Sequence, residues 1–235
     1  MSTDKQTVEK IQARNPYTDP TSLEFKFRAR RFAKVRELIE DALEERGEAH
    51  ILDLGGTEGY WLIGEDFINQ HRGRLKITLV NLAQEVKPVG DTALFTSLAG
   101  DAASPDLFPG EQFDLVHSNS VIEHVGDWSH MTQFANNTKR LGKRYYMQTP
   151  NYWFPYEPHF RTLGFQFLPE SARIALIQRV AMGFFPRIES YEKARDIIKH
   201  HSIISTRQVR QLFSGAEITH EKFMGLNKSI IAIKR

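Results

Sequence analysis

The sequence predicts an α/β fold in which seven strands form one mainly parallel sheet with helices on both faces. Short apolar runs alternate with segments of helical periodicity, which is typical of consecutive strand–helix–strand units. Glycines and polar residues directly follow several of these runs, as they do at the carboxyl ends of parallel strands. The last two runs are joined only by a tight link at 225–227, which predicts an antiparallel C-terminal hairpin.

The expected elements begin with a helix over 21–46, where leucines and phenylalanines recur at helical spacing and Gly47 ends the pattern. Further helices are expected in 58–70, 127–141 and 206–213. The expected strands are "HILDL" (50–54), "LKITLVNL" (75–82), one within "ALFTSLAGDA" (93–102), "QFDLVHSNS" (112–120), "KRYYMQTP" (143–150), "AEITHEKFM" (216–224) and "KSIIAIKR" (228–235).

The chain is expected to form one domain over 21–235, preceded by a flexible polar arm over 1–20. The stretch 151–200 breaks the alternation of strands and helices. It opens with a loop rich in aromatic residues and proline, and helical segments around 170–182 and 189–200 follow. We therefore expect a helical and loop insertion after the fifth strand, which covers the strand ends as a substrate lid.

Composition excludes several classes of protein. The 235 residues carry a formal net charge of +2 and include no cysteine. A nearly neutral chain offers no overall field for nucleic acid, and without cysteine there are no disulfides, thiolate metal sites or cysteine nucleophiles. No apolar run reaches membrane-spanning length, and the N-terminus lacks the apolar core of a signal peptide. We expect a cytoplasmic protein with no nucleic-acid partner and no transmembrane segment.

The stretch "ILDLGGTEGYW" (51–61) carries the clearest functional signal. A buried strand ends in glycines and gives way to a helix. Glycines in this position let backbone N–H groups approach a ligand that a Cβ would hold away. The stretch therefore predicts a nucleotide site, and the nucleotide stays open at this point because such turns serve several cofactors.

Polar residues recur at other strand ends, which an open α/β sheet brings to one edge. They are Asn81 beside Leu82 after the second strand, Asp101 beside Ala102 after the third, and Ser118 and Asn119 at the end of the fourth. A single ligand at that edge can therefore touch several of them.

Together these motifs resemble the class I S-adenosylmethionine-dependent methyltransferases, in particular a bacterial small-molecule branch of type 11 and type 12 enzymes. The likeness extends from about Leu23 to the C-terminus. In that family the first turn reads acidic-x-Gly-x-Gly-x-Gly, and here Thr57 takes the place of the middle glycine. The other segments that carry the resemblance are "GDA" (100–102), "FDLVHSNSVIEHV" (113–125), "TPNYWFPYEPHF" (149–160) and "FMGLNKSIIAIKR" (223–235).

The resemblance implies a Rossmann-like fold and S-adenosyl-L-methionine as the cofactor. It implies an adenine contact for Asp101 and a ribose contact for Asn81, where the family usually has an acid. The cofactor-binding residues that it implies are Asp53, Gly55, Gly56, Thr57, Gly59, Asn81, Leu82, Asp101, Ala102, Ser118 and Asn119.

The implied reaction transfers a methyl group to a hydroxyl, amine or carboxylate of a small molecule, a glycan or a lipid-linked metabolite. A hydroxyl must lose its proton, which a histidine can accept, and the two candidates are His124 and His159. The histidines of "KHHS" (199–202) are expected to be solvated, and no metal site is predicted. A homodimer is left open. The expected substrate contacts are Tyr152, Trp153, Tyr156 and Glu157.

Three other classes of protein share part of this pattern. A non-catalytic cofactor-binding protein of the same fold would share the motifs, and Thr57 and Asn81 depart from the family pattern. An NAD-dependent oxidoreductase would need G-x-G-x-x-G and an acid about twenty residues later, which this chain lacks. A nucleic-acid methyltransferase would more often carry Asn/Asp-Pro-Pro-Tyr/Phe after the fourth strand, where this chain has "SNSVIEH" (118–124).

Overall fold

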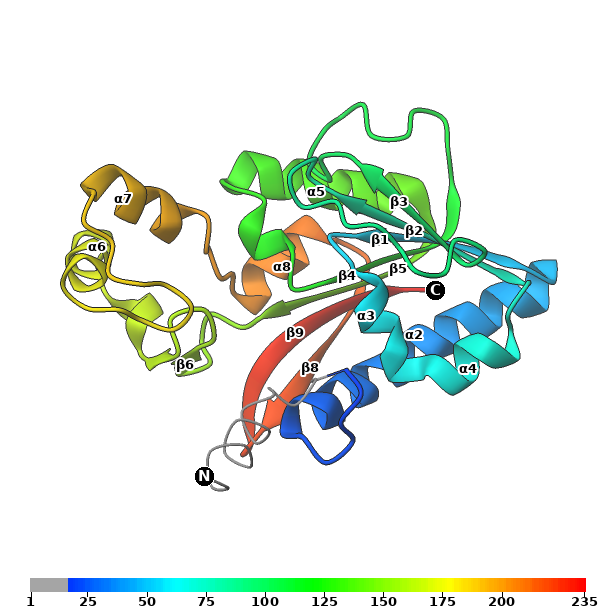
Figure 1. Ribbon diagram of the computed structural model, residues 1–235, viewed down its shortest axis with the longest axis horizontal. Coiled ribbons are helices and arrows are strands. Elements are labelled where there is room, and N and C mark those ends of the chain that lie inside the picture. The colour runs from blue at the N-terminus through cyan, green and yellow to red at the C-terminus, as the bar shows by residue number, and fades with distance from the viewer. Residues whose placement is uncertain (1–16) are drawn as a thin grey trace, which may run out of the picture.

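The computed structural model of the protein describes residues 17–235, so the predicted flexible arm over 1–20 lies almost entirely outside the described residues. A seven-stranded sheet forms the centre of the molecule, in the order β3-β2-β1-β4-β5-β9-β8 (Figure 1). The strands are β1 (Ala49–Leu54), β2 (Leu75–Asn81), β3 (Phe95–Ala99), β4 (Phe113–Asn119), β5 (Gly142–Pro150), β8 (Glu217–Phe223) and β9 (Leu226–Lys234). Strands β1 to β5 run parallel, and β9 is antiparallel to both β5 and β8. The predicted Rossmann-like sheet with a C-terminal hairpin is confirmed.

Helices cover both faces of the sheet (Figure 1). One face carries α2 (Leu23–Arg46), α3 (Glu58–Trp61), the 3-10 helix η1 (Leu62–Gly64) and α4 (Glu65–Gln70), and the other carries α5 (Trp128–Leu141) and α8 (Thr206–Leu212). Helix α2 begins after Ser22, whose hydroxyl accepts a hydrogen bond from the Phe25 N–H, and ends at Gly47 in the left-handed conformation. Within residues 17–235, none of the helices is both long and apolar enough to cross a membrane.

Each face of the sheet has its own apolar core. Ile51 of β1 packs with Val35 and Leu38 of α2, whereas its neighbour Leu52 packs with Phe134 of α5. Successive side chains of a strand point to opposite faces, and in a parallel sheet both faces are buried. This explains why β1 reads as a continuous apolar run in the sequence.

The strand register brings the predicted site residues to one edge of the sheet. Strands β1 and β4 pair so that Asp53 lies beside His117, and β1 and β2 pair Leu54 with Val80. All three strands therefore end together, and the turns that follow them face the same space.

Residues 151–205, between β5 and α8, form a lobe set to one side of the sheet (Figure 1). The lobe contains β6 (Tyr156–Glu157), β7 (Thr162–Leu163), η3 (Phe165–Phe167), α6 (Glu170–Arg179) and α7 (Tyr191–Lys199). It has a core of its own, formed by Phe160, Phe165, Ile174, Ile177, Ala194 and Ile198. The two chain segments that lead into and out of the lobe meet where Asn151 and Ile204 form a parallel bridge.

Candidate cofactor pocket and histidine cluster

The glycine turn after β1 needs its two adjacent glycines for different reasons. Gly55 has a φ of 73°, which residues with a side chain rarely adopt, and its N–H donates to the carbonyl of Val80 at 2.8 Å. A Cβ on Gly55 would also lie 2.5 Å from Cγ2 of Val121. Gly56 has an ordinary backbone conformation, but no side chain fits there, because a Cβ would lie 1.8 Å from Oδ2 of Asp53. The chain thus turns sharply and passes directly over a buried carboxylate.

The carboxylate of Asp53 lies in a buried network, and its expected cofactor contact stays a prediction. Its Oδ2 accepts a hydrogen bond from Nε1 of Trp61 at 2.9 Å, and its Oδ1 lies 2.7 Å from Nδ1 of His117. The side chain of Asp53 is completely buried, and so is nearly all of His117. Sequence reasoning missed His117 because it reads as one more member of a strand, and only the register of β1 against β4 reveals its partner.

A pocket of about 430 Å³, its open mouth included, lies between the glycine turn and the loop that follows β2. Of the predicted cofactor residues, Gly56, Thr57, Gly59 and Asn81 line this pocket. Nδ2 of Asn81 donates to the carbonyl oxygen of Gly56 at 2.9 Å, so this side chain also holds the turn in place. The pocket lining includes residues that sequence reasoning did not single out, among them Glu58, Glu85 and Lys87.

The predicted residues after β2 and β3 lie outside the pocket lining. Leu82 is partly exposed and starts the loop after β2. Asp101 is exposed, and its Oδ1 accepts a hydrogen bond from the Ala103 N–H at 2.8 Å, so it stabilises its own turn. Ala102 is buried, and its carbonyl accepts from Nδ2 of Asn137 at 2.8 Å. The adenine contact assigned to Asp101 stays a prediction.

The end of β4 offers one free acceptor. Ser118 is buried, and its hydroxyl donates to the carbonyl of Leu54 at 3.2 Å. Oδ1 of Asn119 is buried without a hydrogen-bond partner among the described residues. The next residue, Ser120, has a φ of 57°, a conformation that costs energy in a non-glycine residue and is found most often at functional turns. The side-chain oxygen of Asn119 therefore lacks a partner among the described residues, and Asn119 does not belong to the pocket lining.

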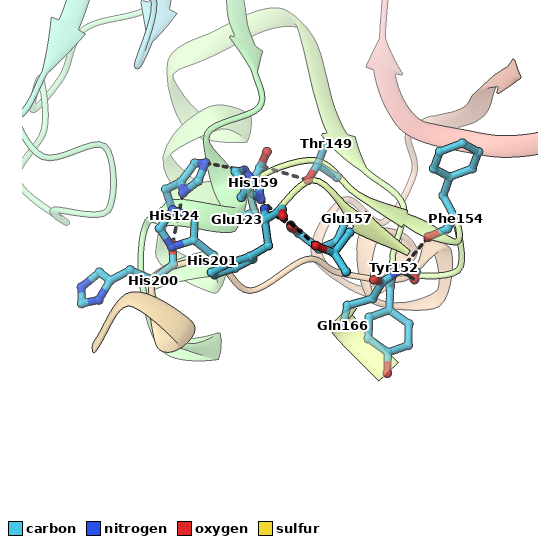
Figure 2. A network of polar contacts seen from close by, with 12 residues as sticks. Glu123, His124, Thr149, Tyr152, Phe154, Glu157, His159, Gln166, His200 and His201 are labelled. Atoms are coloured by element: carbon cyan, nitrogen blue, oxygen red, sulfur yellow. Dashed lines mark hydrogen bonds and ion pairs between the residues drawn. The ribbon is translucent and has the colours of Figure 1, made fainter. Parts of the chain in front are cut away.

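Three segments distant in the sequence meet beyond this turn and form a histidine cluster, defined as Glu123, His124, Glu157, His159 and His201 (Figure 2). Glu123 and His124 belong to the 3-10 helix η2 (Ile122–His124), whereas Glu157 and His159 come from the lobe. The two Nε2 atoms of His124 and His159 lie 3.1 Å apart, and Nδ1 of His159 lies 2.7 Å from Oε1 of Glu157. The structure thus brings both predicted catalytic histidines into direct contact.

Burial determines the charge of several groups in the histidine cluster. It raises the pKa of the Glu123 carboxyl to about 7. Burial, and then the neighbouring His159, lower the pKa of His124 to about 4. Glu85 of the pocket lining acts on the pKa of His124 in the opposite direction, so the cluster lies within electrostatic reach of the pocket. At neutral pH His124 is a neutral imidazole.

His201 corrects the expectation that the "KHHS" histidines are solvated. Its ring centroid lies 4.8 Å from that of His124 and 4.9 Å from that of His159, and burial lowers the pKa of His201 to about 4. Its neighbour His200 is exposed, but the backbone carbonyl of His200 lies 3.1 Å from Nδ1 of His124. The sequence contains no local signal for this arrangement, because the partners are far away along the chain.

The four predicted substrate contacts divide into three groups. Tyr152 lines a second pocket, between η3 and the segment after α7, which His201 also borders. Trp153 is 68% exposed and Tyr156 is 39% exposed. Glu157 is buried, and both its carboxylate oxygens accept hydrogen bonds within the lobe. The structure therefore places Glu157 behind His159, as the group that orients this imidazole, rather than on the surface of a pocket.

Comparison with known proteins adds to this geometry. A family model described as "Methyltransferase domain" matches residues 27–219, which is most of the chain. Two uncharacterized proteins from two strains of Mycobacterium tuberculosis are 31% identical to the chain over 78 residues. That stretch covers 32% of this chain and 27% of each relative, so the chain spans only about a quarter of the length of the curated relatives it matches.

Solved structures resemble the chain in fold. The N-terminal domain of EvdMO1 superposes with a TM-score of 0.51 at 16% identity, over 88% of this chain and 82% of that domain. An O-methyltransferase family protein from Burkholderia thailandensis has a TM-score of 0.47 at 11% identity, over 87% of this chain and 56% of that protein. With the family match over 27–219 and the order of the strands, we conclude that the chain belongs to the methyltransferase domain family and has the fold of the class I S-adenosylmethionine-dependent methyltransferases.

Proposed function

We propose that the protein transfers a methyl group from S-adenosylmethionine to a hydroxyl group of a small molecule, a glycan or a lipid-linked metabolite. The observation that carries this proposal is the Glu157–His159 pair beside the end of β4. A carboxylate accepts the Nδ1 proton of His159, so its Nε2 is left with a lone pair that can take up a proton. A base held by a second group in this way suits removal of a hydroxyl proton.

The pocket beside the glycine turn would hold the cofactor. The glycine turn and Asn81 supply the polar groups of its lining on one side, and Glu58, Glu85 and Lys87 supply charged groups. When bound, S-adenosylmethionine would supply an activated methyl group on a sulfonium, with S-adenosylhomocysteine as the leaving group. The chain itself must hold the acceptor oxygen in line with that bond and keep water out. Nε2 of His159, which contacts Nε2 of His124 at 3.1 Å in this structure, would accept the proton that the hydroxyl gives up once the acceptor lies beside it.

The lobe would act as the lid for the acceptor. It already supplies His159 and Glu157, and Tyr152 and Trp153 lie near its beginning. The EvdMO1 domain was crystallised in the presence of S-adenosylhomocysteine and D-fucose, which makes sugar hydroxyls a sensible first class of acceptor to test.

The cofactor part of the proposal is tested by calorimetric titration of the untagged protein with S-adenosylhomocysteine. We expect saturable binding that weakens at least fivefold in Asn81→Ala, because this variant loses the donor to Gly56. NADH serves as the control ligand. Binding of NADH together with no binding of S-adenosylhomocysteine at millimolar concentration would contradict the proposal.

The acceptor part is tested by transfer of a labelled methyl group to a panel of sugars, phenols, amines and carboxylic acids. We expect labelled sugars or phenols, and a loss of about a hundredfold in turnover for His159→Ala at unchanged affinity for S-adenosylhomocysteine. His130→Ala is the matched control, since His130 lies exposed on α5. Label found only on amines or carboxylates would contradict hydroxyl transfer.

A further inference from the structure

The two contacting histidines of the histidine cluster are both oriented through Nδ1. Nδ1 of His159 lies 2.7 Å from the Glu157 carboxylate, and Nδ1 of His124 lies 3.1 Å from the carbonyl oxygen of His200. A carbonyl oxygen only accepts, and so does an ionised carboxylate, so both Nδ1 atoms carry the proton. In its neutral form, a ring held in this way presents an unprotonated Nε2.

The two Nε2 atoms lie 3.1 Å apart, so two lone pairs face each other at hydrogen-bond distance. This arrangement is repulsive unless something positive lies between them. A shared proton would make one ring cationic in a site where the His201 ring is also packed against both. A metal ion that binds both nitrogen atoms would remove this repulsion without adding a proton to either ring. Two nitrogen ligands at tetrahedral angles around Zn²⁺ lie about 3.3 Å apart, close to the observed spacing.

A carboxylate completes the donor set. Glu123 is completely buried, and its Oε2 accepts a hydrogen bond from the hydroxyl of Thr149 at 2.9 Å. Its Oε1 is buried with no hydrogen-bond partner among residues 17–235. One carboxylate oxygen of Glu123 and one ring nitrogen each of His124 and His159 lie within 4.8 Å of one another, so a small adjustment of side chains would bring all three onto one ion.

We propose that Glu123, His124 and His159 form a binding site for a divalent transition-metal ion such as Zn²⁺. Two imidazoles and one carboxylate suit this class of ion and leave coordination positions open. Glu157 and the carbonyl of His200 hold the two imidazoles by their Nδ1 atoms, as the outer groups of metal sites commonly do. The third imidazole, His201, has its Nδ1 2.7 Å from the carbonyl oxygen of Ile197, so its Nε2 is also unprotonated.

Metal binding at this site does not depend on the proposed methyl transfer. An ion on the Nε2 atoms occupies the lone pair that His159 would use as a base, so the two uses exclude each other in one molecule at one time. The test therefore measures binding of the metal alone, and not activity.

The test is calorimetric titration of ZnCl2 into untagged protein, after treatment with EDTA and dialysis. We expect one ion per chain, with affinity at least tenfold weaker in His124→Ala, His159→Ala and Glu123→Gln. Glu157→Gln keeps the shape of the side chain and should weaken binding by roughly 10- to 100-fold, as a group that orients a ligand does. His130→Ala, which alters an exposed Asp–His pair, should bind like the wild type.

Two further measurements keep the result interpretable. Circular dichroism establishes whether each variant is folded. If an alanine variant does not fold, His159→Asn or His124→Asn is used in its place. The visible spectrum of Co²⁺ added to the wild-type protein reports nitrogen ligation without any substitution. No stoichiometric binding of Zn²⁺ by the wild type would overturn the proposal, and so would unchanged affinity in folded ligand variants.

Discussion

Nδ1 of His117 lies 2.7 Å from Oδ1 of Asp53, with both side chains buried at the centre of the sheet. Asp53 also accepts a hydrogen bond from Trp61, and a Cβ on Gly56 would collide with its carboxylate. Asp53, near the end of β1, therefore packs directly against the glycine turn. Through these contacts Asp53 fixes the position of the turn.

The first prediction is that Asp53→Asn destabilises the protein. The amide keeps the size of the carboxylate but brings an NH2 group against one of two buried N–H donors, which leaves a donor unsatisfied. We expect a loss of about 2–4 kcal/mol in the free energy of unfolding, measured in urea. Asp106→Asn, at an exposed position, should change it by less than about 0.5 kcal/mol. Equal effects of the two substitutions would show that the buried network contributes nothing.

A second prediction separates backbone strain from steric overlap in the glycine turn. Gly55 and Gly73 both have positive φ, 73° and 88°, but a Cβ on Gly73 would meet nothing within 4 Å. Gly73→Ala should therefore cost only the strain of about 1–2 kcal/mol. Gly55→Ala must in addition displace Val121, so we expect it to cost about 1–3 kcal/mol more and to weaken binding of S-adenosylhomocysteine. Urea unfolding measures the loss of stability, and calorimetry measures the binding of S-adenosylhomocysteine. If the two variants proved equally stable, the Val121 contact would be unimportant.

The third prediction concerns pH, because burial raises the pKa of Glu123 from an ordinary 4.5 to about 7. Between these values the folded protein holds a proton that the unfolded chain has released. This group therefore makes the protein less stable as the pH rises from about 4.5 to 7. Glu123→Gln has no such titration, so its free energy of unfolding should rise relative to the wild type by about 2–3 kcal/mol across that window.

Urea unfolding at several pH values, with EDTA present, measures this difference. The neighbouring histidines titrate in both proteins and largely cancel in the comparison. A constant difference between the two proteins from pH 4.5 to 7 would mean that Glu123 is ionised in the folded state throughout.

The fourth prediction concerns the exposed aromatic side chains of the lobe. Trp153 stacks on Phe167 with ring centroids 6.0 Å apart, yet 68% of it is exposed. If it closes over the acceptor, Trp153→Ala should raise the KM for the acceptor severalfold and change stability by less than about 0.5 kcal/mol. Tyr191→Ala is the control, because Tyr191 is 54% exposed at the start of α7. Steady-state kinetics, with an acceptor found in the panel of the Proposed function, would refute this role if the two variants gave equal KM values.

Sequence reasoning found the strands and the glycine turn because both depend on local patterns. Apolar runs and helical periodicity are visible in short windows, and Gly55 and Gly56 lie side by side. The role of Asp53 could not be found in this way, because its partner His117 is 64 residues away. Only the strand register shows that the carboxylate is already satisfied.

The histidine cluster shows the same limit more sharply. His124 and His159 could each be nominated from the residues around them, but their contact spans 35 residues and depends on how the lobe folds back. His201 has no acid next to it in the sequence, so the residues around it predict only a solvated histidine. One local sign existed, since Glu157 and His159 are two residues apart and can pair as carboxylate and imidazole.

The bridge between Asn151 and Ile204 closes the lobe at its base, so the chain leaves the sheet and returns to it at nearly the same place. The N–H of Tyr152 strengthens this closure by donating to the carbonyl of Ile204 at 3.1 Å. Because its two ends lie side by side, an insertion of this kind can change in length or sequence without moving the strands on either side. Grafting the corresponding insertion of a relative would exchange Glu157 and His159 together with the lobe, while the glycine turn and the strand ends stay the same.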